Sequence, residues 1–224
     1  MTKQLSGQVA LVTGASRGLG AATAVALAEA GAHVVLLAKT VGGLEETDDK
    51  VRAVGGQATL MPIDLAEPDK LASLGPVLFE RFGRLDIFVA NAADLGQLTA
   101  VPSADPKVWD RVIAVNLTAN QRLAATLYPL LRVAPSGRAI FVTDKTAITK
   151  KAYWSSYGAA KAALEQIAEA WAIEASVTPL KVRLFDPGPM DTRIRRKAFP
   201  GEKAGTQPAP DLAAKRLVEL ILEA

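Results

Sequence analysis

The sequence predicts a doubly wound α/β fold, in which one parallel sheet lies between two layers of helices. Six short apolar runs alternate with longer segments whose apolar residues follow helical spacing. The runs lack the polar alternation of a half-exposed strand, which favours a parallel sheet covered on both faces. Right-handed crossovers between such strands give a three-layer α/β/α architecture, with an expected strand order of 3-2-1-4-5-6.

Each expected strand is short and rich in Val, Ile, Leu and Phe, and the strands are residues 8–13, 32–38, 58–63, 85–91, 138–143 and 181–186. Each expected helix follows one of these strands, and the helices are residues 18–30, 43–54, 68–82, 106–131, 152–176 and 211–223. No repeat, low-complexity tract or linker interrupts the alternation. Residues 1–224 are therefore expected to form a single domain, with residues 199–210 as the candidate flexible stretch.

Composition excludes several kinds of chemistry. The chain has no Cys and a single His, His33, so thiol catalysis and Cys-ligated metals are excluded and a Ser–His–Asp triad is disfavoured. No metal site is expected. The net charge of +3, without a basic stripe, argues against a nucleic-acid partner. No apolar run approaches the roughly 18 residues of a membrane span or resembles a signal peptide, so a cytoplasmic protein without a membrane partner is expected.

A glycine-rich loop, Thr13-Gly-Ala-Ser-Arg-Gly-Leu-Gly20, joins the first strand to the first helix. Its glycines allow a tight turn, close approach of the backbone to a pyrophosphate and close packing of helix on strand. The helix N-terminus supplies free N–H groups for phosphate oxygens. The alternative is a glycine-rich turn without a ligand. The residues expected to bind a dinucleotide here are Gly14, Ser16, Arg17, Gly18, Leu19 and Gly20.

The end of the second strand indicates which nicotinamide dinucleotide is bound. An acidic residue there accepts hydrogen bonds from a ribose 2′-OH, whereas a basic residue suits a 2′-phosphate. Here the strand ends Leu37-Ala38-Lys39-Thr40, without a carboxylate. Lys39 and Arg17 are therefore expected to face a 2′-phosphate, so NADP is the expected cofactor and NAD remains possible. The alternative is that both are solvated surface cations.

A phenol and an ammonium lie one helical turn apart in the fifth expected helix. Tyr157 and Lys161 are spaced i, i+4, which places both side chains on one helix face. A nearby cation favours phenolate, and a phenol tuned in this way exchanges a proton with a carbonyl or alcohol oxygen. The pair alone is a weak signal, because most such pairs are surface contacts.

Several motifs together are far more specific than any one of them. In chain order they are Thr13-Gly-x-x-x-Gly18-x-Gly20, Asp64-Leu65, Asn91-Ala92, Asn116, Tyr157-x-x-x-Lys161, and Pro187-Gly188 with Thr192. With these motifs the chain, over about residues 5–222, resembles the short-chain dehydrogenase/reductase family of Rossmann-fold oxidoreductases.

The resemblance implies a role for each matching residue. Tyr157 would be the general acid/base, and Lys161 would bind the nicotinamide ribose and lower the pKa of Tyr157. Asn116 would hold a water that links Lys161 to solvent, or else bridge within its own helix. The remaining residues implied at the cofactor site are Asp64 and Leu65 beside the adenine, Asn91 and Ala92 beside its ribose, and Pro187, Gly188, Met190 and Thr192 at the nicotinamide end.

One residue departs from the family pattern at the substrate site. The family has a serine thirteen residues before the tyrosine, where its hydroxyl polarises the substrate carbonyl, and this chain has Asp144. An ionised carboxylate cannot donate a hydrogen bond, and it raises the pKa of a neighbouring phenol. Four alternatives stay open: a protonated Asp144, pairing with Lys145 or Lys151, a hydroxyl from Thr143 or Thr146, or loss of carbonyl chemistry with cofactor binding kept.

Smaller departures affect the cofactor pocket and the assembly. Ala93 replaces a usual glycine, and no seventh strand follows residues 211–223, which argues against a tetramer. A homodimer through residues 106–131 and 152–176 is expected, with a higher homo-oligomer possible. Residues 190–207 carry a cationic cluster that either selects an anionic substrate or is a solvated charge run, namely Arg193, Arg195, Arg196 and Lys197.

The leading hypothesis is an oxidoreductase that transfers a hydride between NADP(H) and a small carbonyl or alcohol substrate. Tyr157 and Lys161 are its principal residues, Asn116 assists, and Asp144 occupies the polarising position. The alternative is a dinucleotide-binding sensor or partner protein with little turnover. Epimerisation or dehydration of a nucleotide-activated substrate is a weaker hypothesis, because the chain leaves little room for a substrate domain. The substrate is not identified by its candidate lining residues, Asp94, Tyr153, Trp154 and Met190.

Overall fold

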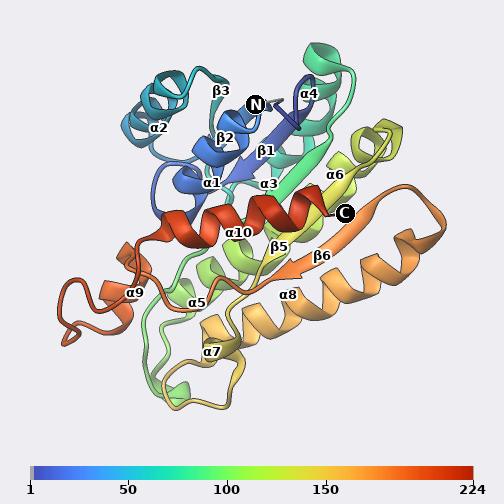
Figure 1. Cartoon of the computed structure of the whole chain (residues 1–224). Coiled ribbons are helices and arrows are strands. Elements are labelled where there is room, and N and C mark those ends of the chain that lie inside the picture. Colours follow the sequence, from blue (N-terminus) through green and yellow to red (C-terminus); the bar gives the residue numbers. More distant parts are fainter. Residues whose placement is uncertain (1–2, 224) are drawn as a thin grey trace.

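The six strands form one parallel sheet in the predicted order, β3-β2-β1-β4-β5-β6. The computed structural model describes residues 3–223. Each strand lies within two residues of its expected bounds, and the strands are β1 (Val9–Thr13), β2 (His33–Ala38), β3 (Gln57–Pro62), β4 (Ile87–Ala90), β5 (Arg138–Val142) and β6 (Lys181–Phe185). The order reverses between β1 and β4, the point at which open parallel sheets bind ligands at their carboxyl edge. Figure 1 shows the sheet between its helices.

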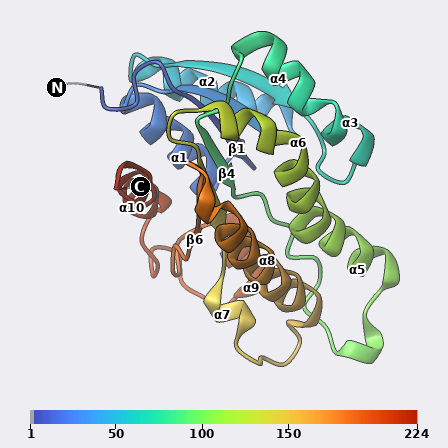
Figure 2. The same ribbon diagram turned by 90° about the vertical axis from the view of Figure 1, so that its right-hand side faces the viewer.

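Helices cover both faces of the sheet. On β1, Ala10 and Val12 pack toward α1 (Gly18–Glu29), α2 (Val41–Ala53) and α10 (Pro210–Leu222). The side chain of Leu11 points to the opposite face of the sheet and packs into the second layer of helices. That layer is built mainly by α4 (Leu74–Phe82), α6 (Ala119–Val133) and α8 (Ser155–Glu174), and Figure 2 shows α6 and α8 across the sheet from α10.

The prediction of a single helix over residues 68–82 is wrong. The structure has two helices there, α3 (Pro68–Ala72) and α4, which meet at Ser73. Pro76 has no N–H, so the carbonyl of Ala72 loses its helical donor four residues on. The Thr126 hydroxyl of α6 donates to that carbonyl instead, at 3.2 Å. The break therefore follows from Pro76, and a contact from a distant segment satisfies the carbonyl that the proline leaves free.

The expected helix at residues 106–131 is also interrupted. It begins as α5 (Pro106–Ile113), where Asp105 caps the first turn by accepting hydrogen bonds from the Lys107 and Val108 amides. Residues Ala114–Thr118 then form a π-helical segment that contains Asn116, and α6 follows. Such π segments are frequent at functional sites, because they reorient the side chains of one turn.

Two short helices near the carboxyl edge were not predicted. They are α7 (Lys145–Ile148), which begins after Asp144, and α9 (Arg193–Ala198), which begins after Thr192. The expected helix at residues 152–176 begins three residues later, as α8, and ends in a 3₁₀ turn at Ala175–Val177. Among residues 3–223, no helix is both long and apolar enough to cross a membrane.

Candidate active site

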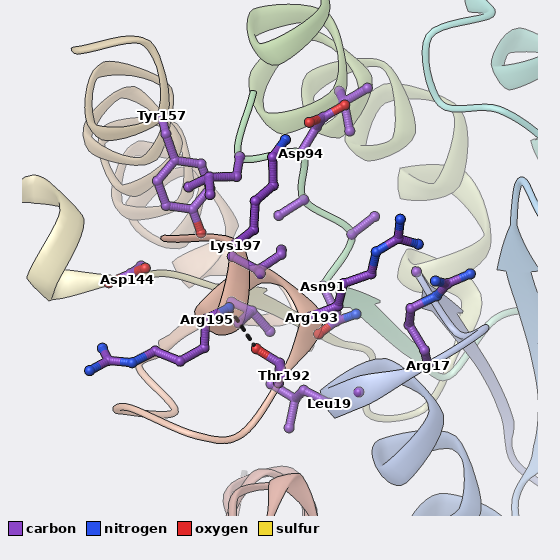
Figure 3. A pocket seen from close by; sticks show the side chains of 18 of the residues that line it. Arg17, Leu19, Asn91, Asp94, Asp144, Tyr157, Thr192, Arg193, Arg195 and Lys197 are labelled. Carbon is purple, nitrogen blue, oxygen red and sulfur yellow. Dashed lines mark hydrogen bonds between the residues drawn. The ribbon is translucent and has the colours of Figure 1, made fainter. Parts of the chain in front are cut away.

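A cavity of about 530 Å³ lies at the carboxyl edge of the sheet, between the glycine loop, α8 and α9 (Figure 3). It collects most of the residues that the sequence predicts for the site. Gly20 and Asn116 are predicted site residues outside its lining. Those in the lining are Gly14, Ser16, Arg17, Gly18, Leu19, Lys39, Asp64, Leu65, Asn91, Ala92, Asp144, Tyr157, Lys161, Pro187, Gly188, Met190 and Thr192.

The glycine loop has the shape of a phosphate cradle. Gly14 and Gly18 have positive φ angles of 68° and 56°, a conformation that favours glycine. A Cβ on Gly14 would lie 2.8 Å from the Cα of Ala92, and a Cβ on Gly20 would overlap the Gly14 carbonyl oxygen. Gly20 therefore allows α1 to pack closely on the loop, although it does not line the cavity. The first turn of α1 has free N–H groups at this end of the helix. This geometry fits the pyrophosphate of a dinucleotide.

Thr13 fastens the glycine loop to the end of β4. Its hydroxyl accepts hydrogen bonds from the backbone amides of Asn91 and Ala92, at 2.9 and 3.0 Å. The Asn91 side-chain amide donates in turn to the Thr13 carbonyl, at 2.8 Å. The Asn91 side chain therefore holds the loop in place beside the cavity.

Charged groups form a chain along the wall beside β2 and β3. The Lys39 ammonium lies 2.9 Å from the Asp64 carboxylate, which also lies 3.4 Å from Arg111, and Arg111 pairs with Asp94 at 3.0 Å. Partial burial opposes ionisation of Asp64, but hydrogen bonds from Lys39 and the Ala66 amide, with the charge of Arg111, lower its pKa. Lys39 and Asp64, predicted separately, are thus ion-paired with each other.

Arg111 was missed by the sequence analysis, because nothing in its local sequence indicates that it reaches two carboxylates from other segments. Arg17 and Arg193 also line the cavity, and neither has a carboxylate within 4 Å among residues 3–223. Figure 3 shows these two arginines on neighbouring segments beside the glycine loop. Two cations without a carboxylate partner among the described residues therefore lie at the end of the cleft that would face phosphates.

Tyr157 and Lys161 project from the first turns of α8 into the cavity, and both are buried. The Lys161 ammonium donates to the Val142 carbonyl at 2.7 Å and lies 5.9 Å from the centroid of the Tyr157 ring. Complete burial lowers the pKa of Lys161 to about 8, although the charges of Asp144 and Glu165 oppose this shift. The ammonium is thus close to a proton-exchanging range.

Asp144 lies on the cavity wall and caps α7, because its Oδ1 accepts a hydrogen bond from the Ala147 amide at 3.1 Å. Burial first, and then the negative charge of Asp144, raise the pKa of Tyr157. The expectation that Lys161 lowers this pKa is therefore outweighed by burial and by Asp144. Figure 3 shows the carboxylate on the side of the cavity where the Tyr157 hydroxyl points.

Two alternatives for Asp144 can be compared with the contacts around it. Within residues 3–223, no lysine or arginine nitrogen lies within 4 Å of the carboxylate, so pairing with Lys145 or Lys151 is not observed. Thr143 and Thr146 both line the cavity. The Thr143 hydroxyl is buried and donates to Glu165, so this donor is already used.

Asn116 lies behind the cavity rather than in its lining. Its side-chain oxygen accepts from the Asp94 amide at 2.8 Å, and its side-chain nitrogen donates to the Asp94 carbonyl at 2.7 Å. These two hydrogen bonds fix the loop after β4, whose Asp94 carboxylate pairs with Arg111. The water-holding role implied by the family resemblance stays a prediction.

Aromatic side chains close the substrate end of the cavity. Trp154 packs against both Tyr157 and Phe199, with ring centroids 6.1 and 5.8 Å away. Phe199 directly follows α9, so the unpredicted helix brings it over the cavity. Tyr153 is 62% exposed and lies outside the lining, so the suggestion that it lines the pocket is wrong.

Two of the four cations in the cluster of α9 are paired with carboxylates. Arg195 pairs with Glu202 through two hydrogen bonds of 2.7 and 2.8 Å, and Arg196 pairs with Asp191 at 2.8 Å. The Lys197 ammonium donates to the Gly96 carbonyl. The sequence signal for this helix was the Thr192 cap followed by six residues without Gly or Pro, and the Thr192 hydroxyl does accept a hydrogen bond from the Arg195 amide.

Comparison with known proteins gives one consistent family. Residues 8–203 match the family model described as short chain dehydrogenase. The chain is 31% identical over 201 residues to the uncharacterized oxidoreductase YciK of Escherichia coli K12, covering 88% of this chain and 79% of that protein. It is 32% identical over 223 residues to the versicolorin reductase stcU of Emericella nidulans, covering 97% and 83% of the two chains.

Solved structures agree with this result. A metagenomic short-chain oxidoreductase crystallised in complex with NADP superposes with a TM-score of 0.85 and is 32% identical in sequence. The superposition covers 99% of this chain and 93% of that one. The similarity thus extends over the sheet, the glycine loop and the helix that carries Tyr157.

Proposed function

The chain belongs to the short chain dehydrogenase family of oxidoreductases, and from this premise we propose that it transfers a hydride between NADP(H) and a small carbonyl or alcohol substrate. The observation that carries the proposal is the position of Tyr157 and Lys161 on the wall of the cavity that the glycine loop also lines. A proton-exchanging phenol and a phosphate cradle in one cleft are the two parts that this reaction needs from a protein.

The cavity residues fit a phosphorylated dinucleotide. The cradle at Gly14 and Gly18 suits the pyrophosphate, and the unpaired Arg17 suits a 2′-phosphate. Lys39 contributes less than expected, because Asp64 already pairs with its charge. The crystallised relative in complex with NADP supports this cofactor over NAD. The residues proposed around the rest of the cofactor are Ser16, Leu19, Gly20, Asp64, Leu65, Asn91, Ala92, Lys161, Pro187, Gly188, Met190 and Thr192.

When bound, the nicotinamide ring supplies or accepts the hydride. The protein's part is to place the substrate oxygen beside the Tyr157 hydroxyl and to manage the proton. Since burial and Asp144 raise the pKa of Tyr157, the phenol stays protonated at neutral pH. A protonated phenol donates to a carbonyl oxygen and is poorly suited to deprotonate an alcohol. We therefore propose that the chain works mainly as a reductase.

Asp144 weakens carbonyl chemistry without removing it. As a carboxylate it offers no hydrogen bond to the substrate oxygen and repels the negative charge that develops there. Loss of one such donor typically costs about 10²- to 10³-fold in rate. Slow reduction of carbonyl compounds is therefore the expected basal activity.

Transfer of a labelled hydride tests this function directly. The protein is incubated with a panel of aldehydes and ketones and with NADPH carrying deuterium at C4, on either face of the ring. Deuterium on the carbinol carbon of a product, absent from a Lys161→Met control, is the expected result. Tight NADPH binding without deuterium in any product would instead favour the sensor or partner protein.

The proposal includes the homodimer and the cytoplasmic location that the sequence suggests. Exposed apolar side chains near the C-terminal ends of α6 and α8 support the dimer, since Val133, Ile173 and Val177 are 61%, 75% and 90% exposed. The mass of the protein in solution, measured by light scattering during gel filtration, distinguishes one chain from two.

A further inference from the structure

The Asp144 carboxylate is an acceptor placed where a substrate's reacting bond would lie. It lines the cavity beside Tyr157, and its Oδ1 is used by the Ala147 amide. The Tyr157 hydroxyl is the neighbouring donor, since, after burial, the charge of Asp144 and hydrogen bonding to it both raise the pKa of Tyr157. A substrate N–H at the reacting bond would also donate to this carboxylate, whereas a carbonyl oxygen could not.

No lysine or arginine nitrogen of the described residues lies within 4 Å of the Asp144 carboxylate. Lys161 and Arg195 are the cations whose pKa values it raises, and both have closer partners. Lys161 donates to the Val142 carbonyl at 2.7 Å, and Arg195 is held by Glu202. Lys151 lies over the ring of Trp154, 5.0 Å from its centroid. The carboxylate therefore presents its negative charge to the cavity.

These contacts favour a substrate that is positively charged at the reacting bond. We propose that the cavity also reduces a cationic carbon–nitrogen double bond, as in a protonated imine, whose N–H is held by Asp144. This inference rests on the proposed NADPH-dependent hydride transfer and adds a substrate class to it. An iminium carbon is a strong hydride acceptor, and the negative charge of Asp144 favours the protonated form of a bound imine.

The step balances without a further reagent. The substrate carbon gains a hydride from NADPH, the π electron pair of the C=N bond becomes the lone pair on nitrogen, and the positive charge is lost. NADPH is oxidised to NADP⁺, and the iminium ion is reduced by two electrons to an amine. An imine that enters neutral requires one proton beforehand, which it takes up from water.

The same carboxylate explains why a ketone is the poorer substrate. Hydride addition to a ketone builds negative charge on oxygen, next to Asp144, whereas addition to an iminium ion builds none. Removing the charge of Asp144 should therefore change the two reactions in opposite directions. Imine reduction should become slower, and ketone reduction should become faster. Asn and Ser both remain good N-caps, so Asp144→Asn and Asp144→Ser keep the start of α7.

The test uses matched pairs of substrates on the full chain with NADPH. The imines 3,4-dihydroisoquinoline and 2-methyl-1-pyrroline are compared with the ketones 1-tetralone and cyclopentanone, with product identified by mass spectrometry. In the wild type, kcat/KM is expected to be higher for each imine than for its matched ketone. Asp144→Asn should lower imine kcat/KM by about 10- to 100-fold, the usual effect of losing a charged hydrogen bond. It should raise ketone kcat/KM, because the side chain no longer repels the negative charge that develops on oxygen.

A binding measurement separates charge recognition from turnover. The protonated amine tetrahydroisoquinoline should inhibit the wild type competitively, and its inhibition constant should rise by a similar factor in Asp144→Asn. Asp105→Asn is the matched control, since Asp105 also caps a helix but lies outside the cavity lining. Asp105→Asn should change neither the imine kcat/KM nor the inhibition constant of tetrahydroisoquinoline.

Two results would overturn the inference. One is a wild type that reduces the ketones but not the imines, which would leave the proposed function intact. The other is an Asp144→Asn variant with undiminished imine reduction and amine inhibition. Absence of NADPH binding in the wild type would overturn the proposed function as well, so the two failures can be told apart.

Discussion

The Lys161 ammonium lies 5.9 Å from the centre of the Tyr157 ring and donates a hydrogen bond to the Val142 carbonyl at the end of β5. One helical turn of α8 separates the two residues, and the last residue of β5 fixes the lysine between helix and sheet. The reactive pair is therefore positioned by the same parallel sheet that places the glycine loop at its carboxyl edge.

The pH profile of the free enzyme should report Lys161. Burial lowers the pKa of Lys161 from its ordinary 10.5 to about 8, so its positive charge is present below pH 8 and is lost above it. Because that charge assists proton donation by Tyr157, kcat/KM should fall as the pH rises through about 8. In Lys161→Arg any remaining activity should lack this descending limb, since a guanidinium stays protonated. A limb unchanged in Lys161→Arg would assign it to another group.

Packing of the glycine loop on α1 should be sensitive to a single methyl group. A Cβ on Gly20 would overlap the Gly14 carbonyl, so Gly20→Ala forces the loop and helix apart. The free energy of unfolding should fall by about 1–3 kcal/mol, and NADPH affinity should fall with it. Gly42→Ala is the control, because no atom lies within 4 Å of the added Cβ and alanine suits helix α2. Equal unfolding midpoints in urea for the two variants would contradict the packing described.

Selectivity for NADPH over NADH should depend on Arg17 more than on Lys39. Arg17 has no carboxylate partner among the described residues, whereas Lys39 is paired with Asp64. Arg17→Ala should weaken NADPH binding by about tenfold or more and affect NADH little, as expected for a charged hydrogen bond to a 2′-phosphate. Lys39→Ala should have a smaller effect. Fluorescence titration of both cofactors checks this, with exposed Arg52→Ala as the control, and a larger loss in Lys39→Ala would reverse the assignment.

The sheet order and the cavity were predictable because parallel strands joined by helices admit few arrangements. The break at Ser73 has a local signal in Pro76, whereas the Thr126 hydroxyl of α6, which satisfies the freed carbonyl, is distant in sequence. Local pattern gave no sign that the Ala72 carbonyl would find this donor.

Some residues of the candidate site also have a local sequence signal, whereas others are defined by partners that are distant in sequence. Tyr157, Lys161 and the glycine loop could be predicted, because their spacing along the chain encodes their function. Arg111 could not, because its two carboxylate partners follow β3 and β4. The departure at Asp144 was visible in the sequence, but its unpaired state depends on where Lys151 and Arg195 find their own partners.

The central claim is that Tyr157 is the proton donor of a hydride-transfer enzyme, and the substitution of its hydroxyl tests this most directly. NADPH affinity and deuteride transfer are measured for wild type, Tyr157→Phe and Tyr128→Phe, using the carbonyl substrate that the wild type reduces fastest. Tyr128 packs against Trp171, outside the cavity lining, and serves as the matched control.

The account predicts that Tyr157→Phe binds NADPH as the wild type does but transfers deuteride about 10²- to 10⁴-fold more slowly, while Tyr128→Phe is unchanged. Deuteride transfer at the wild-type rate in Tyr157→Phe would contradict it.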